Sequence, residues 1–267
     1  MSWIKALILG IVQGLTEFLP VSSSGHLMIG KELLGVHVNP DAETTFEILV
    51  HCATVLSTIY VFRNEIWKLL QGLFKFQMNE ETHYIAKICV SMIPVLVVGL
   101  LFKEQVKAIF GEGVVLVGLM LLVTAILLSL THFVKFKQRK EISYLDAFII
   151  GVSQAIAVFP GLSRSGATIS TGLLLGNKRE DIARFSFLMV LVPILGETFL
   201  SMVGGDFSPQ VSGISYSAMI TGFLAAFVSG LFACKVMITI VKRSKLIYFA
   251  AYCALLGAVS LIWQLFA

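Results

Sequence analysis

Residues 10–35 read GIVQGLTEFLPVSSSGHLMIGKELLG, and residues 151–176 read GVSQAIAVFPGLSRSGATISTGLLLG. The two stretches align without a gap at an offset of 141 residues. Each places Gly, Pro and Ser in the middle of an apolar run, which is typical of a broken helix rather than of a continuous span. A pair of such segments, one in each half of a chain, indicates a site where two half-membrane elements meet.

The composition assigns the chain to the membrane. Of its 267 residues 57% are hydrophobic and only 13% are charged, and the mean hydropathy is +0.90. These values exclude an ordinary soluble domain of this length. We therefore expect an integral membrane protein.

Six stretches outside the two interrupted segments are long and apolar enough to cross a hydrocarbon core of about 30 Å as helices. They cover residues 45–62, 85–102, 114–133, 183–203, 218–240 and 246–266. Three follow each interrupted segment, so an odd number of crossings turns the second half over relative to the first. Each interrupted segment offers only about ten apolar residues before its turn, which favours a re-entrant helix-turn-helix over a span.

The predicted fold is thus an all-α polytopic membrane protein, with six transmembrane helices and two re-entrant helix-turn-helix elements in an inverted-topology repeat. We treat residues 1–267 as a single membrane domain, whose internal repeats cover approximately residues 1–140 and 141–267.

Basic residues in short loops mark the cytoplasmic face of a membrane protein. Only Lys5, Lys31, Lys103 and Lys107 fall on the face of the amino terminus. The opposite face carries Arg63, Lys68, Lys75, Lys135, Lys137, Arg139, Lys140, Lys178, Arg179, Arg184, Lys242, Arg243 and Lys245. We therefore predict that both termini and the mouth of the first broken element face outward, whereas the second element enters from the cytoplasm.

The second turn, PGLSRSGAT at residues 160–168, carries Arg164 at what would be membrane depth, where an isolated cation is costly. A snorkelling arginine is the ordinary explanation, but Arg164 lies in a turn and not near the end of a span. Backbone N–H groups at the start of a helix also favour phosphate. The turn therefore predicts a site for a highly charged phosphate group, with Ser163, Ser165 and Gly166 beside Arg164.

The first turn adds groups that can do chemistry. Gln13 and Glu17 are one helical turn apart and share a face, and the turn that follows carries Ser22, Ser23, Ser24, Gly25 and His26. A lone membrane histidine is often only a satisfied polar residue, yet His26 accompanies a glutamate and three serines. A histidine can be a base or nucleophile in phosphoryl transfer, and a serine beside it can be an activated nucleophile. We favour His26 as the acid/base or nucleophile, with Ser23 close behind, and the sequence does not separate them. Glu17 can hold a divalent cation.

Three further polar residues fall on the outer side. Glu47 and His51 are spaced by four at the start of the first span, and Glu197 lies near the end of the fourth. Helix-end solvation explains each residue alone, whereas the group favours a polar vestibule that opens outward.

At these residues the chain resembles the undecaprenyl-diphosphate phosphatase family of the bacitracin-resistance type. The resemblance covers essentially the whole chain and rests on GIVQGLTEFLPVSSSGH and PGLSRSGAT. It implies hydrolysis of undecaprenyl diphosphate to undecaprenyl phosphate and inorganic phosphate in the bacterial inner membrane, which recycles the lipid carrier for peptidoglycan synthesis. It also implies bacitracin resistance and a divalent cation such as magnesium or calcium.

The family's motifs carry over residue by residue. The acidic motif lies at Gln13 and Glu17, the Ser/His motif at Ser22, Ser23 and His26, and the arginine motif at Ser163, Arg164, Ser165 and Thr168. Many relatives have glutamate where this chain has Gln13, which weakens the expectation that two carboxylates clamp the metal. The resemblance makes His26, Glu17, Ser23 and Arg164 the candidate catalytic residues, and the loop charges predict that the active site opens to the periplasm.

The rival interpretation is a transporter or flippase of a polyprenyl phosphate lipid, because inverted repeats with broken helices also build secondary transporters. The His, Ser and Glu set of the first turn favours an enzyme, since holding an anion needs less chemistry. Topology and anionic lipid explain the basic loops, so we expect membrane lipids and no nucleic acid as partners of these loops. The expected substrate partner is a polyprenyl diphosphate lipid. Small residues in the run 222–230 leave open whether they pack helices within one chain or in a homodimer.

Overall fold

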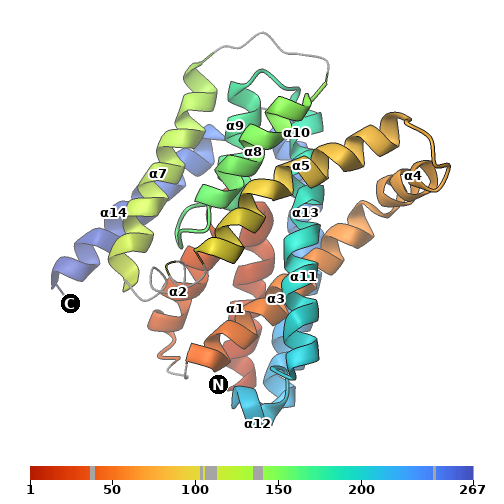
Figure 1. Ribbon diagram of the computed structural model, residues 1–267. Helices are drawn as coiled ribbons and strands as arrows, with labels where there is room; N and C mark the ends of the chain where they lie inside the picture. Colours follow the sequence, from red (N-terminus) through yellow and green to blue (C-terminus); the bar gives the residue numbers. More distant parts are fainter. Residues whose placement is uncertain (37–39, 103–104, 106–112, 135–140, 243–244, 267) are drawn as a thin grey trace.

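A computed structural model of the chain describes residues 1–36, 40–102, 105, 113–134, 141–242 and 245–266 (Figure 1). All regular elements in these ranges are helices. Seven of the basic loop residues used to predict orientation lie outside the described residues, namely Lys103, Lys107, Lys135, Lys137, Arg139, Lys140 and Arg243. The helices in chain order are α1 Trp3–Phe18, α2 Ser23–Leu33, α3 Pro40–Val61, α4 Arg63–Leu73, α5 Glu80–Leu101, α7 Gly113–Phe133, α8 Tyr144–Ile156, α9 Arg164–Leu174, α10 Arg179–Met189, α11 Leu191–Gly204, α12 Pro209–Ser212, α13 Tyr216–Lys242 and α14 Ile247–Phe266.

Six helical stretches of the described chain are long and apolar enough to cross a membrane. They are Ala42–Val61, Glu80–Leu101, Gly113–Phe133, Arg179–Gly204, Tyr216–Val241 and Ile247–Phe266. The six predicted spans are therefore confirmed, with bounds that differ by a few residues.

The fourth span is not one continuous helix. It breaks at Val190, between α10 and α11. Pro193 lies four residues after Met189. Because a proline has no N–H, it donates no hydrogen bond to the carbonyl oxygen of Met189, and the regular helical hydrogen bonds are interrupted there. The break brings residues of both helices beside the candidate site.

The two interrupted segments each form a pair of short helices around a turn. The pairs are α1 with α2 and α8 with α9, and their starts coincide at the offset of 141 residues. Ser2 caps α1 and Ser143 caps α8, while Ser22 caps α2 and Ser163 caps α9. The repeat in the sequence is thus accompanied by a repeat in local structure.

Close helix packing holds the first pair in the centre of the bundle. The small residues of α13 face α1 of the same chain, because a Cβ added at Gly10 would lie 2.9 Å from Ala225 Cβ and one at Gly14 would lie 2.7 Å from Gly230 N. The small-residue run of α13 therefore packs helices within one chain. Figure 1 shows α7 and α14 side by side at the opposite flank. The turns after α1 and α8 lie between α7 and α14 on one side and α1 and α13 on the other.

The two turns contact each other. Ser165 Oγ, in the first turn of α9, donates a hydrogen bond of 3.3 Å to the carbonyl oxygen of Leu19, in the turn after α1. Segments almost 150 residues apart in the chain therefore meet, as the sequence predicted. Polar side chains gather at this meeting point.

Candidate active site

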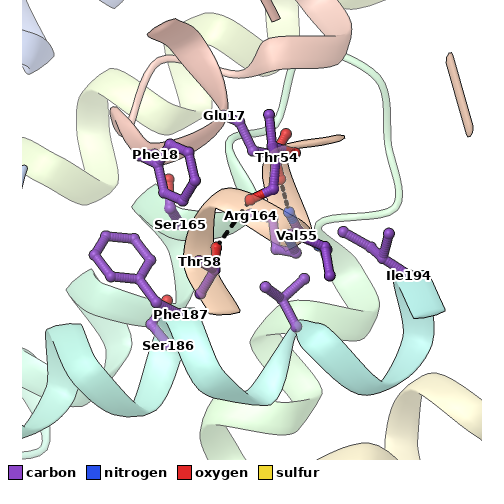
Figure 2. A pocket seen from close by; sticks show the side chains of 11 residues that line it. Glu17, Phe18, Thr54, Val55, Thr58, Arg164, Ser165, Ser186, Phe187 and Ile194 are labelled. Carbon is purple, nitrogen blue, oxygen red and sulfur yellow. Dashed lines mark hydrogen bonds and ion pairs between the residues drawn. The ribbon is translucent and has the colours of Figure 1, made fainter. Parts of the chain in front are cut away.

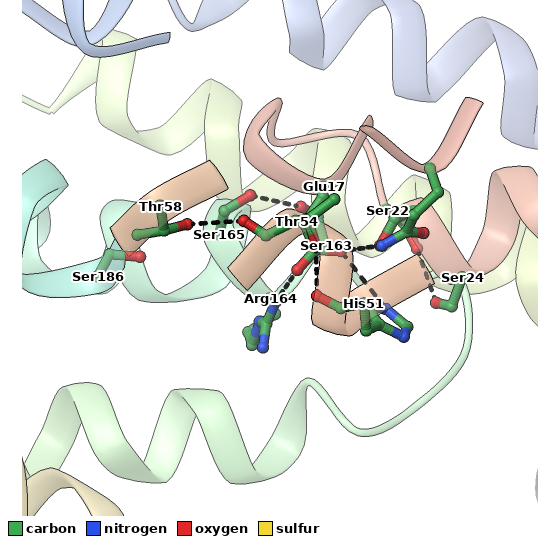
Figure 3. A network of polar contacts seen from close by, with 12 residues as sticks. Glu17, Ser22, Ser24, His51, Thr54, Thr58, Ser163, Arg164, Ser165 and Ser186 are labelled. Atoms are coloured by element: carbon green, nitrogen blue, oxygen red, sulfur yellow. Dashed lines mark hydrogen bonds and ion pairs between the residues drawn. The ribbon is translucent and has the colours of Figure 1, made fainter. Parts of the chain in front are cut away.

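Glu17 is the centre of the polar network shown in Figure 3. It lies in the last turn of α1, and Gln13, one helical turn earlier, donates from Nε2 to Glu17 Oε2 at 2.9 Å. Ser23, the first residue of α2, donates from Oγ to the same oxygen at 2.6 Å. Gln13 is fully buried and Glu17 is only 8% exposed. Charge-assisted bonds of this kind stabilise a buried carboxylate.

Arg164 closes the network from the other repeat. It is the first residue of α9, and its guanidinium donates to Glu17 Oε1. The side chain of Arg164 is 26% exposed, whereas that of Glu17 is 5% exposed. The anion that the sequence predicts beside Arg164 is therefore supplied by the protein itself in this structure. Arg164 and Ser23 occupy equivalent positions of the two repeats, so the two turns give Glu17 matching donors.

His51 adds a further contact to Glu17. It lies on α3, with Nε2 at 3.4 Å from Glu17 Oε2. One turn earlier on α3, Glu47 forms an ion pair with Lys31 of α2, and Lys31 also contacts Glu43. The sequence predicted only that Glu47 and His51 line an outer vestibule, and it did not predict that His51 contacts Glu17.

Glu197 does not join the network. It lies exposed on α11, and no contact of its side chain with Glu17 is described. Of the three predicted vestibule residues, Glu47 and His51 are therefore the two that lie beside the candidate site.

The serines of the two turns make the same cap. Gly25 N donates to Ser22 Oγ at 3.2 Å, and Gly166 N donates to Ser163 Oγ at 3.1 Å. Ser24 Oγ lies 3.3 Å from Ser22 Oγ, and Ser165 Oγ lies 3.3 Å from Ser163 Oγ. The N–H groups of both glycines thus bond to their own capping serines, as the N-cap of a helix requires.

Thr168 points to α10 instead of Glu17. Its Oγ1 lies 2.6 Å from Ser186 Oγ and also bonds to the carbonyl oxygen of Arg164 at 2.9 Å. Thr168 is 1% exposed, so it positions the start of α9 from within the protein.

A pocket opens beside the Glu17–Arg164 pair (Figure 2). Its polar wall carries the hydroxyl groups of Thr54, Thr58, Ser165 and Ser186, and its apolar wall consists of Phe18, Val55, Phe187, Val190 and Ile194. The polar wall can accept hydrogen bonds or donate them, whereas the apolar wall can contact hydrocarbon. The pocket has a volume of about 10 Å³, which is room for about one water molecule, so it marks where polar and apolar walls meet beside the ion pair.

His26 makes hydrogen-bond contacts with two groups, neither of which is Glu17. Its Nδ1 is 2.8 Å from the carbonyl oxygen of Ser22, and its Nε2 is 2.7 Å from the hydroxyl of Tyr252 on α14. Tyr252 was missed by the sequence analysis, because it lies in a span outside the repeated turns and 226 residues after His26. No motif or spacing marks it.

The described residues include no group of three or more His, Cys, Asp or Glu side chains that could hold a metal ion. Glu17 is the carboxylate at the meeting point of the turns, and Gln13 Oε1 beside it is buried without a hydrogen-bond partner. Carboxylate and amide oxygens are ligands that Mg²⁺ and Ca²⁺ accept. The residues therefore fit a cation that takes its remaining ligands from a bound phosphate, and they do not form a complete cage.

Comparison with known proteins places these residues in a family. The family model described as bacitracin resistance protein BacA matches residues 6–259. The undecaprenyl-diphosphatase of Bacteroides thetaiotaomicron is 55% identical, over 99% of this chain and 100% of its own length. Those of Bacteroides fragilis and Parabacteroides distasonis are 54% and 56% identical, each over 98% of both chains. This chain therefore belongs to the bacitracin resistance protein BacA family.

Proposed function

We propose that this protein hydrolyses undecaprenyl diphosphate to undecaprenyl phosphate and inorganic phosphate, and that bacitracin resistance follows from this activity. Family membership and the names of the full-length relatives support the substrate. The observation that carries the chemistry is that Glu17 joins Ser23 of one turn to Arg164 of the other. A potential nucleophile, a carboxylate and a cation for phosphate thus lie at one point.

Ser23 is the nucleophile that this geometry favours. Its hydroxyl already donates to Glu17, which can accept the proton when Ser23 Oγ attacks the terminal phosphorus. A Ser23–phosphate bond forms, the bridging P–O bond breaks, and undecaprenyl phosphate leaves with the electron pair. Water then hydrolyses the phosphoserine and releases inorganic phosphate. His26 as the nucleophile is less favoured, because its two ring nitrogens are engaged by Ser22 and Tyr252.

Arg164 has two partners in this mechanism. Without substrate it neutralises Glu17, and an incoming diphosphate competes with Glu17 for the guanidinium. As Arg164 turns to the diphosphate, it releases Glu17 Oε1, while Glu17 Oε2 still accepts the hydrogen bond of Ser23. Substrate binding would therefore free one carboxylate oxygen beside the nucleophile.

A divalent cation such as magnesium or calcium is part of the proposal. Glu17 and Gln13 Oε1 would hold it together with oxygens of the diphosphate, an arrangement that Mg²⁺ commonly adopts. When bound, such an ion neutralises phosphate charge and assists the leaving group.

We further infer that both helix pairs are re-entrant and that the two halves form an inverted repeat within a single domain. The helices of the first pair have 16 and 11 residues, too few for two full crossings. In Figure 1 the α1–α2 pair enters and leaves from the lower end and the α8–α9 pair from the upper end, which supports opposite directions of entry. Together with the loop charges, this favours periplasmic termini and a site that opens to the periplasm of the inner membrane.

The test is phosphate release from undecaprenyl diphosphate by detergent-purified protein with magnesium. We expect turnover by the wild type and its collapse in Arg164→Ala, in His26→Ala and with chelator. Trapping an acid-stable phosphoserine would support Ser23, whereas an acid-labile linkage would exclude it as the nucleophile. If a well-folded wild type shows no turnover, the enzyme proposal is refuted and the lipid transporter becomes the favoured function.

A further inference from the structure

The proposed function expects activity to be lost without His26, but it assigns no step to His26 or to its partner on α14. Tyr252 is 44% exposed on α14, and the planes of its ring and of the His26 ring are only 12° apart, with centroids at 5.6 Å. The hydroxyl of Tyr252 is 2.7 Å from His26 Nε2. The two rings therefore lie almost in one plane and are joined at their edges by the hydrogen bond, which restricts how the imidazole is turned.

The second contact of His26 decides which nitrogen carries the proton. Nδ1 is 2.8 Å from the carbonyl oxygen of Ser22, and a carbonyl oxygen can only accept. Nδ1 must therefore bear a hydrogen, and in the neutral ring Nε2 has the lone pair. The Tyr252 hydroxyl then donates to Nε2, the nitrogen whose lone pair can take up a proton.

A hydroxyl suits both states of an acid or base. When Nε2 is bare, the Tyr252 hydroxyl donates to it, and when Nε2 is protonated, its N–H donates to the Tyr252 oxygen. The contact therefore survives each proton transfer. A phenylalanine in place of Tyr252 would keep the ring and lose the bond in both states.

The pair belongs to one repeat only. The position equivalent to His26 in the second turn is Ala167, which is 2% exposed and has no side-chain polar atom. The cap serines of the two turns match, so the backbone alone does not account for the His26–Tyr252 contact. The contact is an addition to the first turn.

We propose that Tyr252 is a positioning residue, which holds His26 as the Nδ1–H tautomer with Nε2 ready to exchange a proton during phosphoryl transfer. The inference rests on the proposed function, and it adds an acid or base role for His26 beside that of Glu17. It adds a residue of the last helix to the machinery of the two turns.

The kinetic test compares wild type, His26→Ala, Tyr252→Phe and the double variant on undecaprenyl diphosphate. We expect Tyr252→Phe to lower kcat by about tenfold to a hundredfold, with KM almost unchanged, because a displaced catalytic group costs rate rather than substrate binding. In the His26→Ala background the same substitution should change kcat less than about twofold, because residues that act through one another are not additive. A second full loss in the double variant, or full activity in Tyr252→Phe or His26→Ala, overturns the proposal.

The matched control is Tyr248→Phe, one helical turn earlier on α14 at a residue that is 68% exposed. It should leave kcat unchanged, and thermal unfolding in detergent should show that all variants are folded. A comparable loss of kcat in Tyr248→Phe would overturn the assignment to Tyr252.

A second readout does not depend on activity. In protein with 15N-labelled histidine, the signals missing from His26→Ala identify the His26 ring. We expect Nδ1 protonated and Nε2 bare in the wild type, and a displaced Nε2 signal in Tyr252→Phe. A ring protonated on Nε2 alone, or an Nε2 signal that Tyr252→Phe leaves in place, refutes the positioning role even if phosphate release is never observed.

Discussion

Removal of Arg164 should destabilise this protein more than neutralisation of Glu17, although the two residues form one ion pair. The reason is the difference in burial, because the side chain of Glu17 is 5% exposed and that of Arg164 is 26% exposed. Arg164→Met leaves the more buried charge without its cation, whereas Glu17→Gln leaves the charge that solvent still reaches.

The magnitudes follow from these exposures. Loss of one partner of a buried pair costs about 3–5 kcal/mol of unfolding free energy, which we expect for Arg164→Met. Glu17→Gln keeps a neutral acceptor for Ser23 and Gln13 and loses the ion pair with a partly solvated arginine, so about 1.5–3 kcal/mol is expected. In the double variant no charge is left alone, and its stability should return to within about 1 kcal/mol of the wild type, since apolar replacement of a buried pair is often close to neutral.

Unfolding free energies of the four proteins in mixed micelles give this double-mutant cycle, and phosphate release gives activity. All three variants should be inactive, because the proposed reaction needs both side chains. The reasoning is refuted if Arg164→Met is no less stable than Glu17→Gln, or if the losses in the double variant add. Recovered stability with absent activity would separate the structural from the catalytic part of the pair.

Three further predictions use other parts of the molecule. Ser23→Ala should lower kcat by about a thousandfold or more and abolish labelling of the enzyme from substrate with a radioactive terminal phosphate; labelling that persists would contradict a serine nucleophile. Chelation should stop phosphate release and magnesium should restore it, so turnover that is indifferent to chelator removes the cation from the proposal. Gly14→Ala should cost about 1–3 kcal/mol of stability, because its Cβ would lie 2.7 Å from Gly230 N, whereas Gly99→Ala, with no atom within 4 Å, should not destabilise; equal effects would show that α1 and α13 are not closely packed.

Much of this fold could be predicted because the two strongest signals are local. Apolar length predicted the six spans, and the shared turn sequence predicted two helix pairs around matching turns. The break of the fourth span at Val190 was not predicted, although Pro193 indicates it. Apolar length alone predicted that span, and hydropathy does not register the missing N–H of a proline.

The site was only partly predictable, because contacts between distant helices leave no local pattern. The sequence required an anion near Arg164 and assigned that role to a substrate, whereas in the structure Glu17 also fulfils it. His51 and Tyr252 reach the two turns from α3 and α14, and no spacing in the chain relates them to Glu17 or His26. Only the packing of whole helices brings these side chains together.

The repeat explains how one backbone device serves two chemical purposes. Ser22 and Ser163 cap their helices in the same way, so each turn presents its next residue at the same place relative to the helix start. In the first turn that residue is Ser23, and in the second it is Arg164. Since the turns meet at Glu17, duplication places a hydroxyl and a guanidinium on the two oxygens of one carboxylate. Neither half alone supplies both groups, so on the proposed mechanism activity requires the two halves to pack against each other.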